Sequence, residues 1–127
     1  MIIAISVDAN CSNTNDEEAK TINSPNYPSN YPNRKQCSWK VTAPEGARIK
    51  IEPFSYHLED DRVCRLDYLK IYDGPSNIYN RIARLCGSGF YEHLQTTSTT
   101  NSLYLEFNSD ISTSFSGFQL AFSLIGI

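Results

Sequence analysis

The stretch Cys64-Arg65-Leu66-Asp67-Tyr68-Leu69-Lys70-Ile71-Tyr72-Asp73-Gly74 decides the fold class of this chain. Within it, the apolar residues Leu69 and Ile71 alternate with residues that carry polar groups. A period of two is typical of a β-strand with one buried and one solvated face. The following Gly74-Pro75 pair favours a turn, because proline fixes φ and glycine tolerates positive φ. The stretch therefore predicts a strand that begins near a cysteine and ends in a tight turn.

The same alternation recurs along most of the chain. Turns rich in proline and glycine separate the alternating segments, and no stretch sustains a helical period of 3.6 residues. Many short strands between such turns are typical of a β-sandwich or β-barrel. The sequence thus predicts an all-β fold, with strands expected within 37–42, 48–52, 68–72, 103–108 and 118–123.

Length, charge and hydropathy exclude several classes of protein. The chain has 127 residues, which corresponds to one domain. Its formal net charge is -3 and it has no block of lysine and arginine, so nucleic acid is not an expected partner. No apolar run approaches the roughly 18 residues that a membrane-spanning helix needs. We therefore expect one globular domain with no membrane span.

The four cysteines indicate the cellular compartment. Cys11, Cys37, Cys64 and Cys86 form no CxxC pair, and no histidine stands at zinc-finger spacing. An even number of widely spaced cysteines favours disulfides, which imply an oxidising compartment. The alternative is four buried thiols in a cytosolic protein. Four cysteines allow three pairings, and spacing alone does not choose among them.

The first ten residues are expected to lie outside the domain. Their apolar stretch is too short for a secretory signal and lacks a basic segment before it. Residues 1–10 are therefore interpreted as an N-terminal extension or leader, and 11–125 as the domain. Asn10-Cys11-Ser12 matches the N-glycosylation sequon, which adds a little support for export.

Carboxylates concentrate at two places beside expected strands. One place is 58–67, which contains Glu59, Asp60, Asp61 and Asp67, and the other contains Asp110. Hard cations such as calcium take oxygen ligands from carboxylates and main-chain carbonyls. If the fold brings these loops together, a cation between them would relieve their mutual repulsion. The alternative is a set of solvated loop acids, since the spacing is not that of an EF-hand.

The order of short motifs along the chain resembles a CUB domain. The resemblance covers the chain from Cys11 to about Phe122 and implies a jelly-roll-like sandwich of two antiparallel sheets. It also implies sequential disulfides, Cys11–Cys37 and Cys64–Cys86. The motifs that carry it are Cys11, 24–28, 31–32, 37–39, 43–46, Phe54, 58–59, 64–69, 71–74, 85–87, 108–110 and 117–118.

The resemblance also implies a calcium site. Calcium-binding members place a glutamate five residues before the third cysteine, an aspartate three after it, and an aspartate in a later SDxS segment. The matching positions here are Glu59, Asp67 and Asp110, with the main-chain carbonyl of Ser112 as a further ligand. Tyr31 matches a tyrosine that tends to lie near this site, although it is equally interpreted as a packing residue.

Two binding functions follow from the resemblance, and catalysis is not expected. Calcium-binding members often recognise a basic side chain, commonly lysine, on an extracellular protein; Tyr31, Asp60 and His57 are the candidate partner-binding residues. The alternative is a carbohydrate-binding module like the spermadhesins of this family. A sugar binder is expected to keep exposed aromatic platforms. The chain lacks HExxH, GxSxG and P-loop patterns, so it is not expected to be an enzyme.

Overall fold

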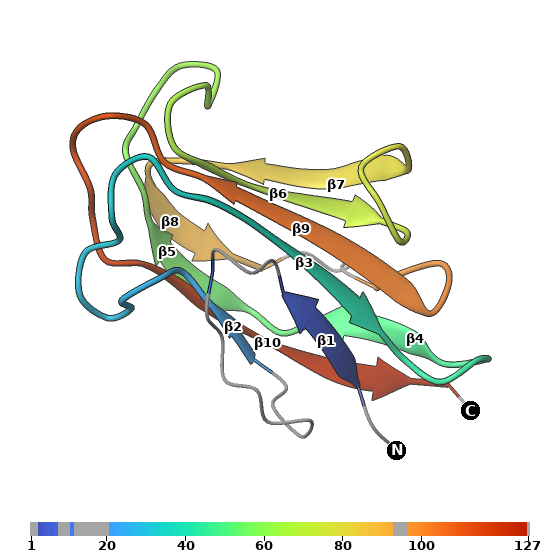
Figure 1. The fold of residues 1–127 in the computed structure, drawn as a ribbon. Coiled ribbons are helices and arrows are strands. Elements are labelled where there is room, and N and C mark those ends of the chain that lie inside the picture. The colour runs from blue at the N-terminus through green and yellow to red at the C-terminus, as the bar shows by residue number, and fades with distance from the viewer. Residues whose placement is uncertain (1–2, 8–10, 12–20, 93–96, 127) are drawn as a thin grey trace.

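The computed structural model describes residues 3–7, 11, 21–92 and 97–126, and two antiparallel β-sheets pack face to face within them (Figure 1). The predicted all-β sandwich is confirmed. In the order of its strands, the first sheet contains β1 (Ala4–Val7), β3 (Gln36–Thr42), β9 (Ser102–Asn108), β6 (Tyr68–Asp73) and β7 (Asn80–Leu85). The second contains β2 (Thr21–Asn23), β10 (Gly117–Ile125), β5 (Phe54–His57) and β8 (Ser88–Tyr91), and β4 (Arg48–Ile51) pairs with β10. None of the described elements is a helix that could span a membrane.

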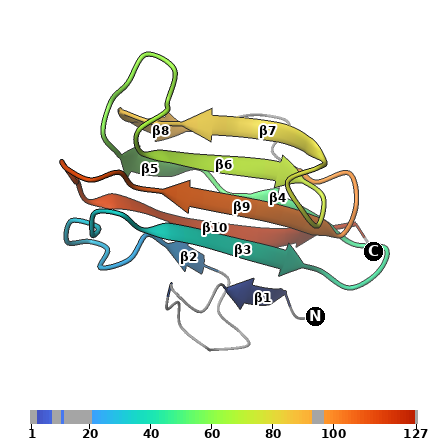
Figure 2. The same ribbon diagram turned by 45° about the horizontal axis from the view of Figure 1, so that its top comes forward.

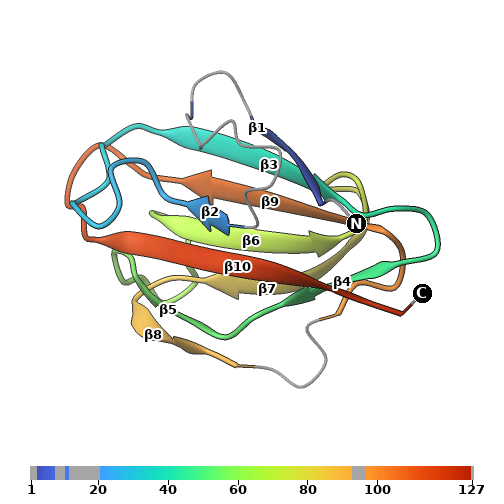
Figure 3. The ribbon, with the colours of Figure 1, turned by 90° about the horizontal axis from the view of Figure 1, so that it is seen from below.

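The strand β10 organises the second sheet. It pairs with β5 at its first two residues, with β2 in its middle and with β4 at its end. Figure 3, seen from below, shows β10 running between β2 on one side and β5 and β4 on the other. One continuous strand therefore aligns three short ones.

An aromatic core joins the two sheets. Trp39 and Phe107 of the first sheet contact Phe118 of the second, with ring centroids 6.1 and 5.5 Å apart in edge-on geometry. All three side chains are buried because they occupy inward positions of alternating strands. The alternation read from the sequence thus identifies the core residues of these strands.

Part of the N-terminal extension is paired with the first sheet. Residues 4–7 form the edge strand β1, antiparallel to β3, and Ile3 is buried in the core. The sequence interpretation placed these residues outside the domain. A four-residue apolar alternation is too short to separate an edge strand from a linker by pattern alone, so the pairing becomes visible only in three dimensions.

Two disulfides cross-link the sandwich. They join Cys11 to Cys37 and Cys64 to Cys86, the sequential pairing that the resemblance implies. The first attaches the chain before β2 to β3. The second attaches the loop between β5 and β6 to the end of β7.

Three loops meet at one end of the sandwich, on the left in Figure 1. They are the loop from β2 to β3 (24–35), the loop from β5 to β6 (58–67) and the loop from β9 to β10 (109–116). The first and third loops are bound to each other through their backbones. Arg34 N donates to Asp110 O at 2.7 Å, and Tyr31 N donates to Phe115 O at 3.0 Å. The topology therefore brings segments far apart in sequence to one place.

Candidate metal centre

Three carboxylates converge where the loops meet. Glu59 follows β5, Asp67 precedes β6 and Asp110 follows β9. Each offers one oxygen, and these oxygens all lie within 4.8 Å of one another. The structure thus brings together the three side chains that the sequence analysis proposed as calcium ligands. Their role as ligands stays a prediction.

Asp67 is the buried member of this carboxylate cluster. Its side chain is fully buried, with Oδ2 accepting a hydrogen bond from Tyr31 OH at 2.5 Å and Oδ1 accepting one from Asp110 N at 2.7 Å. Burial raises the pKa of Asp67, the two hydrogen bonds oppose that rise, and the charge of Asp110 adds to it. Both oxygens are therefore fixed in position while each keeps a lone pair for a further ligand.

Glu59 is held less completely than Asp67. Its main-chain N–H donates to Tyr31 OH at 3.1 Å, but its buried Oε1 has no hydrogen-bond partner among the described residues. Burial raises the pKa of Glu59, and the charges of Asp110 and Asp67 raise it further. A buried carboxylate oxygen without a partner is costly, and a bound cation would stabilise it. The donor set of carboxylate oxygens fits a hard cation such as calcium.

Tyr31 lies beneath the cluster and positions it. Its side chain is 1% exposed, and its ring packs edge-on against Phe107 with centroids 5.1 Å apart. The hydroxyl donates to Asp67 and accepts from Glu59 N, and burial raises the pKa of Tyr31. This burial agrees with the interpretation of Tyr31 as a packing residue, and its contact with a partner stays a prediction. Tyr31 connects the aromatic core to two of the carboxylates.

The other predicted site residues lie around the cluster. Asp60 and His57 are exposed, and the His57 ring stacks on Phe115 with centroids 4.3 Å apart. Ser112 N donates to Asp110 Oδ1 at 3.3 Å, which orients that carboxylate. The role of the Ser112 carbonyl stays a prediction, and Asn10 lies outside the described residues.

The sequence analysis missed two residues that position Asp110 and Asp67. Buried Ser109 donates through Oγ to Pro32 O at 2.6 Å and accepts from Lys35 N at 2.9 Å. Asn108 Nδ2 donates to Leu66 O at 3.0 Å. Short polar side chains directly before a candidate ligand are a signal for such loop contacts.

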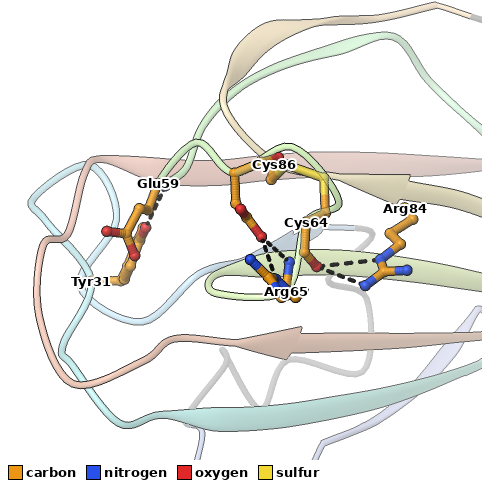
Figure 4. The surroundings of a disulfide bond; sticks show 7 residues. Tyr31, Glu59, Cys64, Arg65, Arg84 and Cys86 are labelled. Carbon is orange, nitrogen blue, oxygen red and sulfur yellow. Dashed lines mark hydrogen bonds and ion pairs between the residues drawn. A yellow bond between two sulfur atoms is a disulfide. The ribbon is translucent and has the colours of Figure 1, made fainter.

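The Cys64–Cys86 disulfide braces the loop that contributes Glu59 and Asp67. Figure 4 shows Arg84 donating to the carbonyl of Cys64, through Nε at 3.3 Å and Nη2 at 3.0 Å. Within the loop, Asp61 accepts from Arg65 N at 2.9 Å, and this hydrogen bond lowers the pKa of Asp61. Asp61 is thus engaged inside its own loop rather than in the carboxylate cluster.

We expect Tyr31→Phe to lower the free energy of unfolding by about 1.5 kcal/mol, because the Asp67 carboxylate and Glu59 N–H each lose a buried partner. Urea denaturation of both proteins measures the difference. Tyr91→Phe serves as the control, because it makes the same chemical change on β8 of the second sheet. Equal losses in the two variants would contradict a positioning role for the Tyr31 hydroxyl.

Comparisons with known proteins agree with this architecture. A profile of the CUB domain matches residues 11–122. Human Tolloid-like protein 2 is 33% identical over 116 residues, which are 91% of this chain and 11% of that protein. Embryonic protein UVS.2 of Xenopus laevis is 35% identical over 84% of this chain and 20% of that protein. The chain therefore spans a fifth or less of the length of these two relatives.

Solved structures show the same fold. The CUB1-EGF-CUB2 region of human MASP-1/3 has a TM-score of 0.71 and 28% identity, over 84% of this chain and 41% of that one. The MASP-1 CUB2 domain crystallised with bound Ca2+ has a TM-score of 0.64 and 31% identity, over 80% of this chain and 88% of that one. The sandwich, its two disulfides and the match over residues 11–122 lead to one conclusion, that this chain belongs to the CUB domain family of non-catalytic protein-interaction modules.

Proposed function

We propose that this CUB domain binds calcium through Glu59, Asp67 and Asp110 with the carbonyl of Ser112, and that the calcium-loaded end recognises a lysine side chain of an extracellular protein. The observation that carries the proposal is the buried Glu59 Oε1, which has no hydrogen-bond partner among the described residues and belongs to a carboxylate cluster. The similar MASP-1 CUB2 domain, which binds Ca2+, supports the choice of metal.

Calcium would act here mainly by ordering the loops. Burial is the main cause of the raised pKa values of Glu59 and Asp67, and repulsion between carboxylates of the loops 58–67 and 109–116 raises both pKa values further. A divalent cation replaces that repulsion with shared coordination, and waters complete its shell of six to eight oxygens. A partner then meets a rigid surface, which reduces the entropy cost of binding.

The charge and shape of this end suit a basic partner group. Glu59, Asp67, Asp110 and exposed Asp60 carry four negative charges, so two remain after calcium binds. A lysine ammonium has three donors for carboxylate lone pairs that the metal leaves free. Exposed Ile111, at 68%, adjoins Asp110 and offers an apolar contact for the lysine stem.

We infer an extracellular location for the domain from two supports. The first is the pair of disulfides, which form and persist in oxidising compartments. The second is that proteins with CUB domains are mostly extracellular or secreted.

We expect Asp110→Ala to weaken calcium binding at least tenfold in calorimetric titration, because one of three clustered carboxylates is lost. The main-chain N–H that Asp110 donates to Asp67 remains in this variant. Glu45→Ala, an exposed acid in the turn between β3 and β4, is the control with the same charge change. Absence of calcium binding by the unaltered domain would exclude the site.

Recognition of lysine is tested separately with a small amine probe. N-acetyl-lysine methylamide is expected to shift the NMR amide signals of Asp60 and Ile111 in calcium, less so in EDTA and less so at high salt, which screens exposed charges. Shifts that are the same in EDTA would show that calcium is structural only and not required for recognition.

A further inference from the structure

The outer face of the first sheet carries a surplus of positive charge. Figure 2 shows β3, β9, β6 and β7 side by side in this sheet. Side chains alternate along a strand, and residues that pair across strands share a face. The charged residues that point outward from these strands are four cations and one carboxylate: Lys40, Lys70, Arg81, Arg84 and Glu106. This basic face therefore has an excess of three positive charges on a chain whose net charge is -3.

The four cations of the basic face have no acidic partner. Within the described residues the one ion pair joins Arg65 to Asp61, in the loop before β6. Glu106 Oε2 accepts from Asn77 Nδ2 at 3.2 Å instead of pairing with a cation. The positive charge of this face is therefore left without a counter-charge from the domain itself.

Protection of the sheet edge does not account for this charge. Cations on an edge strand prevent unwanted strand pairing, which is a sufficient reason for Arg81 and Arg84 on β7. Lys40 and Lys70 stand on β3 and β6, which have a paired neighbour on each side. Burial lowers the pKa of Lys70, and the charges of Arg84 and Arg81 lower it further against the opposing effect of Glu106. An anion bound here would relieve that repulsion.

One row of the basic face alternates charge with aromatic surface. It crosses the strands in the order Lys40, Tyr104, Tyr72 and Arg81. The two tyrosine rings lie 6.2 Å apart between their centroids. Three strand spacings separate the two cations, which is about 14 Å. An extended peptide covers that distance with four or five residues.

Apolar contact is available inside and beside this row. Tyr104 and Tyr68 line a pocket of about 270 Å³ on the basic face. The turn between β6 and β7 borders the face through the Asn77 contact with Glu106, and its Ile78 is 83% exposed. A ligand that combines carboxylates with an apolar side chain therefore matches both properties of the surface.

We propose that the basic face binds an acidic segment of a partner protein, in which an apolar residue stands between carboxylates. The carboxylates accept hydrogen bonds from Lys40 and Arg81 at the two ends of the row and from Lys70 beside it. The apolar side chain packs on the Tyr104 ring. Arg84 is already held by the carbonyl of Cys64 and keeps Nη1 free for a further acceptor.

The distribution of charge favours a short acidic segment over a long polyanion. Four cations on one face offer few contacts to a nucleic acid or a sulfated polysaccharide, whose affinity depends on many. A long polyanion would also reach the acidic loops at the end of the sandwich, where Glu59, Asp67 and Asp110 gather. A segment of about five residues stays on the basic face.

NMR titration of the isotope-labelled domain with a blocked pentapeptide of four glutamates around a central phenylalanine tests the proposal. The peptide is expected to shift the amide signals of Lys40, Lys70 and Tyr104, equally in calcium and in EDTA, and to bind less tightly as salt is added. A peptide with glutamine in place of every glutamate is expected to leave these signals unchanged. Alanine in place of the phenylalanine is expected to weaken binding several-fold.

A pair of double variants with the same charge change locates the binding surface. Lys40→Gln with Arg81→Gln is expected to weaken the peptide roughly tenfold, because two exposed ion pairs are lost. Arg48→Gln with Lys50→Gln, at exposed positions of β4 in the second sheet, is the control. The control is expected to stay within about twofold of the unaltered domain.

The proposal is overturned if the acidic peptide does not bind, if the glutamine peptide binds equally well, or if both double variants lose the same affinity. Shifts that centre on Asp60 and Ile111, or that need calcium, would also contradict it. A heparin hexasaccharide that binds at these residues more tightly than the peptide would assign the face to sulfated glycans instead. Because the test holds in EDTA, failure of the calcium site does not affect its result.

Discussion

Asp67→Ala is expected to abolish detectable calcium binding and to lower the free energy of unfolding by about 3 kcal/mol. The stability loss has a local cause. Tyr31 OH and Asp110 N both donate to the fully buried Asp67 carboxylate, and alanine leaves both donors without an acceptor. Each buried donor left unpaired costs about 1–3 kcal/mol, and relief of repulsion with Glu59 and Asp110 offsets part of the total. The calcium loss follows because the most buried of the three proposed ligands is gone.

Urea denaturation in EDTA measures the free energy of unfolding without bound calcium, and calorimetric titration measures calcium affinity. Asp60→Ala is the matched control, because it removes an exposed carboxylate of the same loop. We expect it to change the free energy of unfolding by no more than about 0.5 kcal/mol. If Asp67→Ala retained calcium affinity within a few-fold, the assignment of Asp67 as a ligand would be wrong.

The fold class and the convergence of the acidic residues could be anticipated from sequence for different reasons. Alternation is local, so Leu69 and Ile71 reveal their strand without tertiary information. No local pattern places Asp110 beside Asp67. Only the order of motifs shared by a family predicts that the two residues meet, and in the structure the main-chain N–H of Asp110 donates to Asp67 Oδ1.

The direction of the Tyr31 side chain and the arrangement of polar side chains on the outer face of the first sheet could not be anticipated in this way. Whether a tyrosine in a proline-rich loop points outward or inward depends on packing, here against Phe107. That arrangement depends on register: Gln36, Asn108 and Tyr68 lie side by side only because three strands pair in one alignment, and a slip of one residue would turn each side chain to the other face.

Removing each disulfide in turn separates its effect on the free energy of unfolding from its effect on calcium binding. The two disulfides span 26 and 22 positions, so removing either one by alanine substitution of both cysteines is expected to cost about 3 kcal/mol, mainly through the unfolded chain. Their effects on calcium binding should differ. Loss of Cys64–Cys86 is expected to weaken calcium binding at least tenfold, whereas loss of Cys11–Cys37 should leave the calcium affinity within about twofold of the unaltered domain.

We expect different calcium affinities in the two double variants because the two disulfides hold different parts of the chain in place. Cys64 lies three residues before Asp67, and Cys86 precedes Gly87, whose N–H donates to Glu59 O at 3.3 Å and whose carbonyl accepts from Leu58 N at 2.8 Å. The Cys64–Cys86 bridge therefore ties the chain on both sides of the loop that supplies two proposed ligands, while Cys11–Cys37 ties only the start of β3. Calorimetry on the two double variants, with urea denaturation to establish equal destabilisation, measures the contrast. Equal weakening of calcium binding would mean that the affinity follows overall stability, and that the bridge does not shape the site.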